Sequence, residues 1–275
     1  MFLALPPLLG YINGVPLTPN PNTVSDFFGG LQGIFLFLIA VAATMNTVSG
    51  EFETGSITPL LTKPVSKNTV FVGKMVASVL TLLGIYAFLT VYVIVSALVI
   101  EGPQNNLQLA PLGLVGLTIA TMVWASIVIL IGTVSKSSLV AALASFGIYI
   151  GLTIAGAILG AVYGQTAILF YAPGSGATGS TGSCGVEGVA TTFPTGTDNL
   201  GYLLMQLALI PNTVLNYCGV RLRGGGMQGA ELFTSSTSTI ADAALRALGV
   251  SAAYIAVLLV VSWYAFRRSQ IIESG

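Results

Sequence analysis

Five apolar segments, each long enough to cross a lipid bilayer, constrain this chain more than any other feature. A helix needs roughly 20 apolar residues to cross about 30 Å of hydrocarbon. The segments that reach this length span about residues 27–48, 70–100, 111–134, 139–170 and 249–266. Charged residues make up 7% of the chain, against about a quarter in an average soluble domain. The sequence predicts an all-α integral membrane protein, a polytopic helical bundle forming one transmembrane domain over residues 1–275.

The N-terminal segment, Met1–Ile12, is apolar but too short to span a membrane. It lacks the basic start and the small-residue cleavage site of a signal peptide. We expect it to be the outer end of a further span whose beginning is missing, which predicts five full spans plus a partial one. The alternative interpretation is a segment lying at the membrane interface.

The composition excludes several classes of function. The chain has no histidine, which excludes histidine-ligated haem, His-based zinc sites and Ser-His or Cys-His nucleophile pairs. No G-x-x-x-x-G-K-[ST] loop is present to cradle phosphates. The net charge of zero gives no sign of nucleic-acid binding. We therefore expect neither an enzyme nor a cofactor or metal held by this chain.

The placement of the basic residues predicts the orientation, because cytoplasmic loops carry an excess of Lys and Arg. Strict alternation of the spans puts six of them on one side: Lys63, Lys67, Lys74, Lys136, Arg267 and Arg268. This side is predicted to be the cytoplasm, with the C-terminus in it. The chain is then a multi-pass protein of the cell membrane, with residues 171–248 outside the cytoplasm.

The segment 171–248 has a composition of its own. It opens with a Gly/Ser/Thr-rich stretch typical of a flexible loop, and Leu200–Ile210 predicts a short apolar helix that Pro211 ends. Cys184 and Cys218 both lie here, where oxidation is permitted. We expect a disulfide that fastens the Gly-rich loop onto the short helix; two free thiols are the alternative.

The loop at residues 49–69 is the largest on the predicted cytoplasmic side. Thr58 can cap a short helix, and Pro64 ends it. Ile57, Leu60 and Leu61 share one face of that helix at i, i+3, i+4 spacing. Such an apolar face with flanking charges suits a docking site for a partner protein or, equally, a helix resting on lipid headgroups.

This loop resembles the first cytoplasmic loop of type-2 ABC transporter permeases. The usual family form is an acidic pair, Gly-Thr, a Leu pair, Pro-Val-Ser-Arg and then Gly-Lys entering the next span. The matching positions are Glu51, Glu53, Gly55, Leu60, Leu61, Pro64, Val65, Ser66, Gly73 and Lys74. The chain departs mildly at Ser56 and Lys67, and further at Pro59, which shortens the helix. The Phe266-Arg267-Arg268 ending is also similar to the family's F-x-R-R.

The resemblance implies a six-span permease subunit of an ATP-driven exporter. It implies two permease subunits, identical or different, and two separate ATPase subunits that hold ATP and Mg. On this interpretation the ATPase-coupling residues are Glu51, Glu53, Gly55, Ile57, Leu60, Leu61, Lys63, Pro64 and Lys67. A non-transporting membrane anchor that recruits an ATPase, or organises a complex outside the cytoplasm, is the alternative function.

The predicted spans contain no ionisable residue in their interiors, whereas ion-coupled transporters need such groups. This pattern indicates that energy for transport comes from a partner. Four aromatic residues are candidates for lining a transport path, although aromatic side chains also favour cores and interfaces. They are Tyr86, Tyr92, Trp124 and Tyr149.

Overall fold

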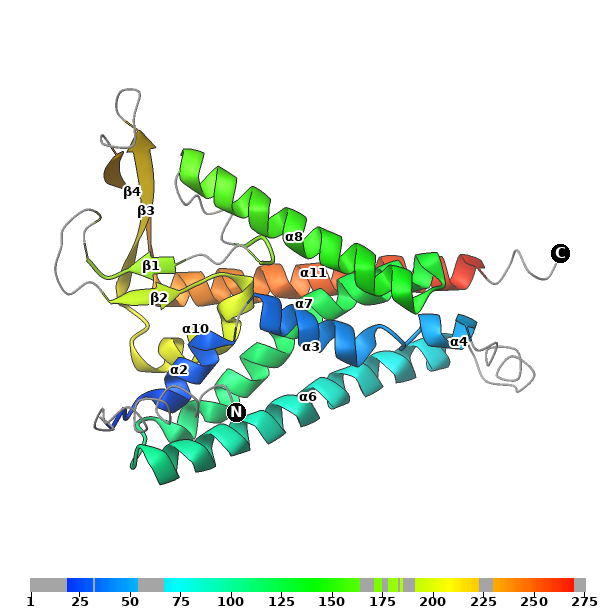
Figure 1. The fold of residues 1–275 in the computed structure, drawn as a ribbon, viewed down its shortest axis with the longest axis horizontal. Helices are drawn as coiled ribbons and strands as arrows, with labels where there is room; N and C mark the ends of the chain where they lie inside the picture. The colour runs from blue at the N-terminus through cyan, green and yellow to red at the C-terminus, as the bar shows by residue number, and fades with distance from the viewer. Residues whose placement is uncertain are drawn as a thin grey trace, which may run out of the picture.

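The structure is a computed structural model that describes residues 19–31, 33–53, 67–163, 171–174, 178–182, 184, 191–222 and 230–269. The segment 1–18, on which the prediction of a partial span rests, lies outside the described residues. Helices run side by side along the length of the molecule, and a small β-sheet covers one end of them (Figure 1).

Four long apolar helices form the body of the bundle: α6 (Lys67–Ile100), α7 (Ala110–Ser135), α8 (Ser138–Tyr163) and α11 (Ile240–Ser269). Within the described residues these are the helices long and apolar enough to cross a membrane, and a bent pair gives a fifth. The spans predicted at 70–100, 111–134 and 139–170 correspond to α6, α7 and α8. The helix of the last span is longer than the predicted 249–266. It begins at Ile240, directly after the strand that ends at Thr239.

The first predicted span is not one continuous helix. It is divided into α2 (Thr23–Gly30) and α3 (Ile34–Thr44), whose axes differ by 71°. Gly33, between them, has a φ of +57°, a backbone conformation that glycine adopts without a steric penalty. The hydrophobic pattern is continuous across this point, and it therefore predicted a straight span where the backbone bends.

Helix α7 is the centre of the bundle and packs against α3, α6, α8, α10 (Leu200–Leu209) and α11. Its apolar stretch is 67% buried, against 6% for α8 and 17% for α11. Small residues allow its closest contact: a Cβ on Gly116 would lie 2.5 Å from the Cα of Gly201 in α10. The two backbones touch, so α10 rests directly on α7. The sequence predicted α10 to within one residue.

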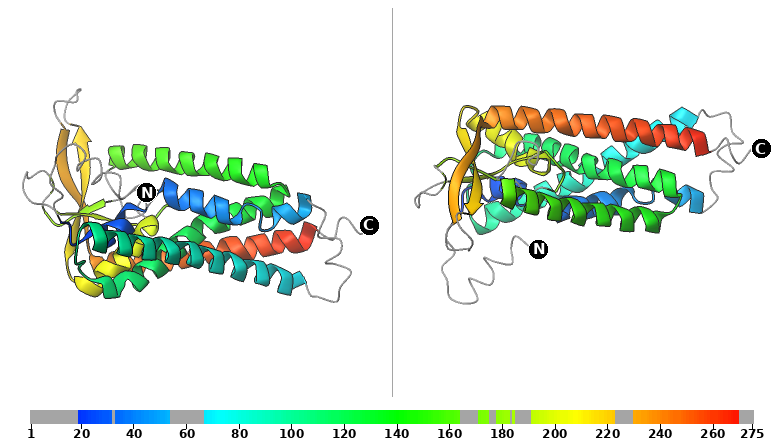
Figure 2. Two further views of the ribbon diagram at one scale, coloured as in Figure 1. Left: turned by 60° about the horizontal axis from the view of Figure 1, so that its bottom comes forward. Right: turned by 90° about the horizontal axis from the view of Figure 1, so that it is seen from above.

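A four-stranded antiparallel sheet covers one end of the bundle (Figures 1 and 2). Its strands are β1 (Thr178–Ser180), β2 (Thr192–Pro194), β3 (Val214–Leu222) and β4 (Ala230–Thr239), in the order β2-β1-β3-β4. The prediction of an all-α protein is wrong for this segment. We read its Ser, Thr and Gly residues as loop, but Thr, Val and Tyr also suit a pleated surface, and nine paired positions join β3 to β4.

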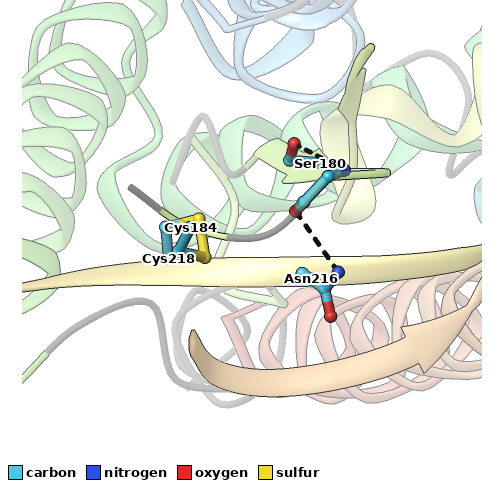
Figure 3. Close-up of a disulfide and its surroundings, with 5 residues drawn as sticks. Ser180, Cys184, Asn216 and Cys218 are labelled. Carbon is cyan, nitrogen blue, oxygen red and sulfur yellow. Dashed lines mark hydrogen bonds between the residues drawn. A yellow bond between two sulfur atoms is a disulfide. The ribbon is translucent and has the colours of Figure 1, made fainter. Parts of the chain in front are cut away.

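The predicted disulfide between Cys184 and Cys218 is present in the structure (Figure 3). It lies beside the pairing of Ser180 in β1 with Asn216 in β3. The second partner differs from the expected one, because Cys218 belongs to β3 and not to the short helix. The bridge therefore joins the turn after β1 to the longest hairpin of the sheet.

The described basic residues of the predicted cytoplasmic loops gather at the end opposite the sheet. Figure 1 shows α4 (Ser49–Glu53), the start of α6, the α7–α8 turn and the C-terminal end of α11 there. We call it the basic end and the other the sheet end. Its basic residues are Lys67, Lys74, Lys136, Arg267 and Arg268. This grouping is the one that the predicted topology requires.

Candidate functional site

The predicted coupling loop, residues 49–69, starts from the basic end as α4, which contains Glu51 and Glu53. Lys67 is the first residue of α6, so the loop leaves and re-enters the bundle at the same end. Several predicted coupling residues lie outside the described residues: Gly55, Ile57, Leu60, Leu61, Lys63 and Pro64. The side chain of Glu53 is described, and it makes the principal contact of α4.

The Glu53 carboxylate binds the first residue of α8. One oxygen accepts a hydrogen bond from the backbone N–H of Ser138 at 2.7 Å, and the other accepts one from the Ser138 hydroxyl at 2.8 Å. The backbone bond, and then the hydroxyl bond, lower the pKa of Glu53 below its ordinary value because both stabilise the ionised form. A carboxylate here also suits the partial positive charge at a helix N-terminus.

Three elements meet closely around this contact. Ser49 in α4 donates a hydrogen bond to the backbone carbonyl of Met45 and lies 3.2 Å, Oγ to Oγ, from Ser138. A Cβ on Gly132 of α7 would lie 3.4 Å from both the Ser49 hydroxyl and the Cβ of Ala141 in α8. The small residues let α4 sit in the corner between α7 and α8, which brings Glu53 within reach of Ser138.

Further contacts tie the rest of the basic end together. The ammonium group of Lys74 in α6 donates to the carbonyl of Thr47, just before α4. The Trp263 indole N–H of α11 donates to the Asn68 side chain of α6 at 3.0 Å. A small apolar cluster fills the space between these helices: Val48, Phe71, Met75, Ile129 and Phe266. The predicted coupling loop thus begins at a packed platform, to which α6, α7, α11 and the residues just before α4 contribute.

The four aromatic candidates for path lining occupy different environments. Tyr86 of α6 and Trp124 of α7 are fully buried inside the chain's own core, and the Tyr86 hydroxyl pairs with Thr121. Tyr92 is 42% exposed on α6, and Tyr149 of α8 is half-buried. Tyr92 and Tyr149 therefore keep exposed surface, and the role of all four residues in lining a path stays a prediction.

An aromatic cluster joins α8 to the centre of the bundle. The Tyr149 ring stacks on Phe37 of α3 with centroids 5.0 Å apart, and it meets Trp124 edge-on at 5.4 Å. Phe37 and Trp124 are themselves 5.6 Å apart in an edge-to-face pair. Both geometries are favourable for aromatic rings. The cluster is a contact of α8 separate from the one at Glu53.

A buried carboxyl lies close to this cluster on the sheet side. Asp198, in the short helix η2 (Thr197–Asn199), is 4% exposed, and its side chain accepts a hydrogen bond from the Gly174 N–H at 2.9 Å. Burial raises its pKa to about 7, although the Gly174 amide and the neighbouring Trp124 indole oppose the shift. Asp198 forms no ion pair among the described residues.

The sequence did not predict the contact of Glu53 with Ser138 or the burial of Asp198, for different reasons. Ser138 follows Lys136 and Ser137 at the start of an apolar run, which is a helix-start signal, but no pattern pairs it with Glu53, 85 positions earlier. Asp198 lies between spans in sequence and gave no sign of burial. Within the described residues, no three His, Cys, Asp or Glu side chains form a group able to hold a metal ion.

Comparison with known families decides the class of protein. A family model described as "ABC-2 family transporter protein" matches residues 31–271, almost the whole chain. The chain belongs to this ABC-2 transporter family. No curated protein matches it significantly. Membership makes the chain a multi-pass ABC transporter permease, a transport component without an ATPase of its own, and confirms the family expected from the loop motif.

Proposed function

We propose that this ABC-2 permease is the membrane subunit of an ATP-driven exporter, working with a separate ATPase and a second permease subunit, identical or different. The ATPase docks on the loop at residues 49–69, where the apolar face of Ile57, Leu60 and Leu61 fills a groove on it. ATP and Mg are held by that partner. The basic end faces the cytoplasm of the cell, and the sheet end faces outward.

The main support for this proposal is the family match over residues 31–271. The matched range includes the loop motif at residues 49–69. The structure adds support, since the motif emerges from a packed platform at the basic end. Within the described helices α6, α7, α8 and α11, the Asp, Glu, Lys and Arg residues lie toward the helix ends, which supports an energy source outside these spans.

Transport into inverted membrane vesicles tests the proposal. The full chain, expressed with the ATPase that co-purifies with it, is assayed with an amphipathic fluorescent dye, because so apolar a path suits such molecules better than ions. We expect dye to accumulate with ATP and Mg but not with ADP. Failure of ATP to drive movement of the dye or of membrane lipids, in a complex that hydrolyses ATP, would overturn it.

The runner-up function is a membrane anchor that recruits an ATPase or organises an outer complex. One observation favours it, namely a disulfide-bonded sheet large enough to offer a binding surface at the sheet end. The vesicle assay separates the two functions, because an anchor binds the ATPase but moves no dye.

A further inference from the structure

Helix α8 is held to the rest of the chain at few places. Its apolar stretch is 6% buried, and it runs along the outside of the bundle (Figures 1 and 2). It contacts the α4–α7 corner at the basic end, the Phe37–Trp124 pair through Tyr149, and β3 at the sheet end. A helix with so little buried surface is positioned by those contacts and moves when one of them moves.

At the basic end, two polar contacts join α8 to the predicted coupling loop in the described part of the chain. Glu53 binds Ser138 through its carboxylate, and the Ser49 hydroxyl lies 3.2 Å from the Ser138 hydroxyl, so the Glu53 contact is the charged one of the two. Both Glu53 oxygens are used on Ser138, and hydrogen bonds to an ionised group are stronger than those between neutral ones. Small residues also face each other there, since a Cβ on Gly132 would lie 3.4 Å from the Cβ of Ala141. Only Lys136 and Ser137 separate α7 from α8, which allows α8 to pivot about this point.

We propose that Glu53 is a positioning residue that transmits displacement of the coupling loop to α8. The inference rests on the proposed function, since it takes the ATPase to be what moves the loop. When α4 shifts, the carboxylate carries the first turn of α8 with it. A rigid helix of 26 residues is about 39 Å long, so a tilt of about 5° at the basic end moves its far end by about 3 Å. The motion reaches Tyr149 and then β3.

Distance measurements between spin labels test this transmission in the full complex with its ATPase in lipid nanodiscs. Cys184 and Cys218 are paired, so labels go selectively to introduced cysteines. Ile158→Cys on α8 and Leu245→Cys on α11 are exposed and lie toward the sheet end. We expect their separation to change between the nucleotide-free complex and the complex trapped with ATP and vanadate.

Glu53→Ala should abolish this change and lower the dye transported per ATP hydrolysed by about tenfold, the loss expected for charge-assisted hydrogen bonds. Asp26→Asn removes an exposed carboxylate at the sheet end and serves as the matched control, with the change retained. Equal expression and equal midpoints of thermal unfolding exclude a folding defect as the cause.

Ser138→Pro removes the amide and hydroxyl donors at the first helical position, where proline is tolerated. It should reproduce the Glu53→Ala result, and the double variant should lose no more than Ser138→Pro alone, because Ser138→Pro already removes both Glu53 bonds, together with the Ser49 contact. Ser138→Ala keeps the hydrogen bond from the backbone N–H and should give an intermediate loss of transport per ATP. It replaces Glu53→Ala as the test if that variant does not fold.

Two outcomes are distinguishable. A parent complex that transports dye while the α8 separation stays fixed overturns the inference and leaves the proposed function standing, as does Glu53→Ala with an unaltered change. A parent complex without ATP-driven transport overturns the proposed function first.

Discussion

At the scale of single residues, two carboxyl groups in this chain are shifted in opposite directions by their surroundings. Glu53 is exposed, and its pKa is lowered by donors on Ser138, so it stays ionised below the ordinary range of a glutamate. Asp198 is buried, and the loss of hydration outweighs its hydrogen bonds and raises its pKa to about 7. The first group holds two elements together as an anion; the second opposes folding when it ionises.

The shift of Asp198 predicts a pH dependence of stability. A carboxyl with a folded-state pKa of about 7 and an ordinary value of 3.8 binds its proton more tightly in the folded protein, so stability falls as pH rises between these values. The slope from this group is about 1.4 kcal/mol per pH unit. Thermal unfolding in detergent should show Asp198→Asn more stable than the parent at pH 8 and similar at pH 4. A parallel pH dependence in both proteins would contradict the account.

At the scale of elements, the close packing of α10 against α7 depends on Gly116 and Gly201. A Cβ on Gly116 would overlap the backbone of Gly201, which cannot move aside as a side chain does. We predict that Gly116→Ala lowers the free energy of unfolding by about 1–3 kcal/mol. Gly147→Ala on α8 is the control, since nothing lies within 4 Å of its Cβ position, and alanine favours a helix. Equal unfolding midpoints for the two variants would show that the close packing is not present.

The coupling loop carries a second prediction at this scale. Leu60→Asp places a charge on the predicted apolar face and should uncouple ATP hydrolysis from dye transport while membrane insertion is retained. Val134→Asp, at an exposed position in the last turn of α7, adds a charge at the same end of the bundle outside the loop and serves as a control. Unchanged transport in Leu60→Asp would count against docking through this face and would favour a helix lying on lipid headgroups.

Hydrophobic length and motif were enough to predict most of the elements. The spans of α6, α7 and α8, the short helix α10 and the family all follow from local sequence. The bend at Gly33 does not, because glycine is also tolerated in straight membrane helices. Nor does the pairing of β3 with β4, because the polar residues that build these strands are equally frequent in loops.

The candidate site was predictable only in part. The motif predicted the acidic residues Glu51 and Glu53 in the coupling loop, and in the structure the backbone of both lies in α4 at the basic end. The partner of Glu53 lies 85 positions away, and the burial of Asp198 depends on how η2 packs against α7, α10 and α11. Long-range contacts of this kind leave no trace in the spacing of one sequence.

At the scale of the whole molecule, the sheet end contains the disulfide, and the basic end is where the predicted coupling loop leaves the bundle. The sheet is fastened by the Cys184–Cys218 bridge across 34 positions, and it continues directly into α11. Removing such a bridge from a loop of this length costs about 2–4 kcal/mol. We predict that Cys218→Ser lowers the unfolding midpoint, and that a reducing agent lowers it for the parent but not for the variant. An equal response of both to reduction would contradict this.

The central claim is that an ATPase docks on the loop at residues 49–69. Site-specific photo-crosslinking in intact cells tests it most directly, with the photoreactive amino acid at Leu60 and, as a control, at exposed Val214 in β3. We predict that Leu60 alone captures a soluble protein, and that this protein is labelled by a photoreactive ATP analogue. Crosslinks from Leu60 only to lipid, or the same ATP-binding protein captured from Val214, would contradict the account.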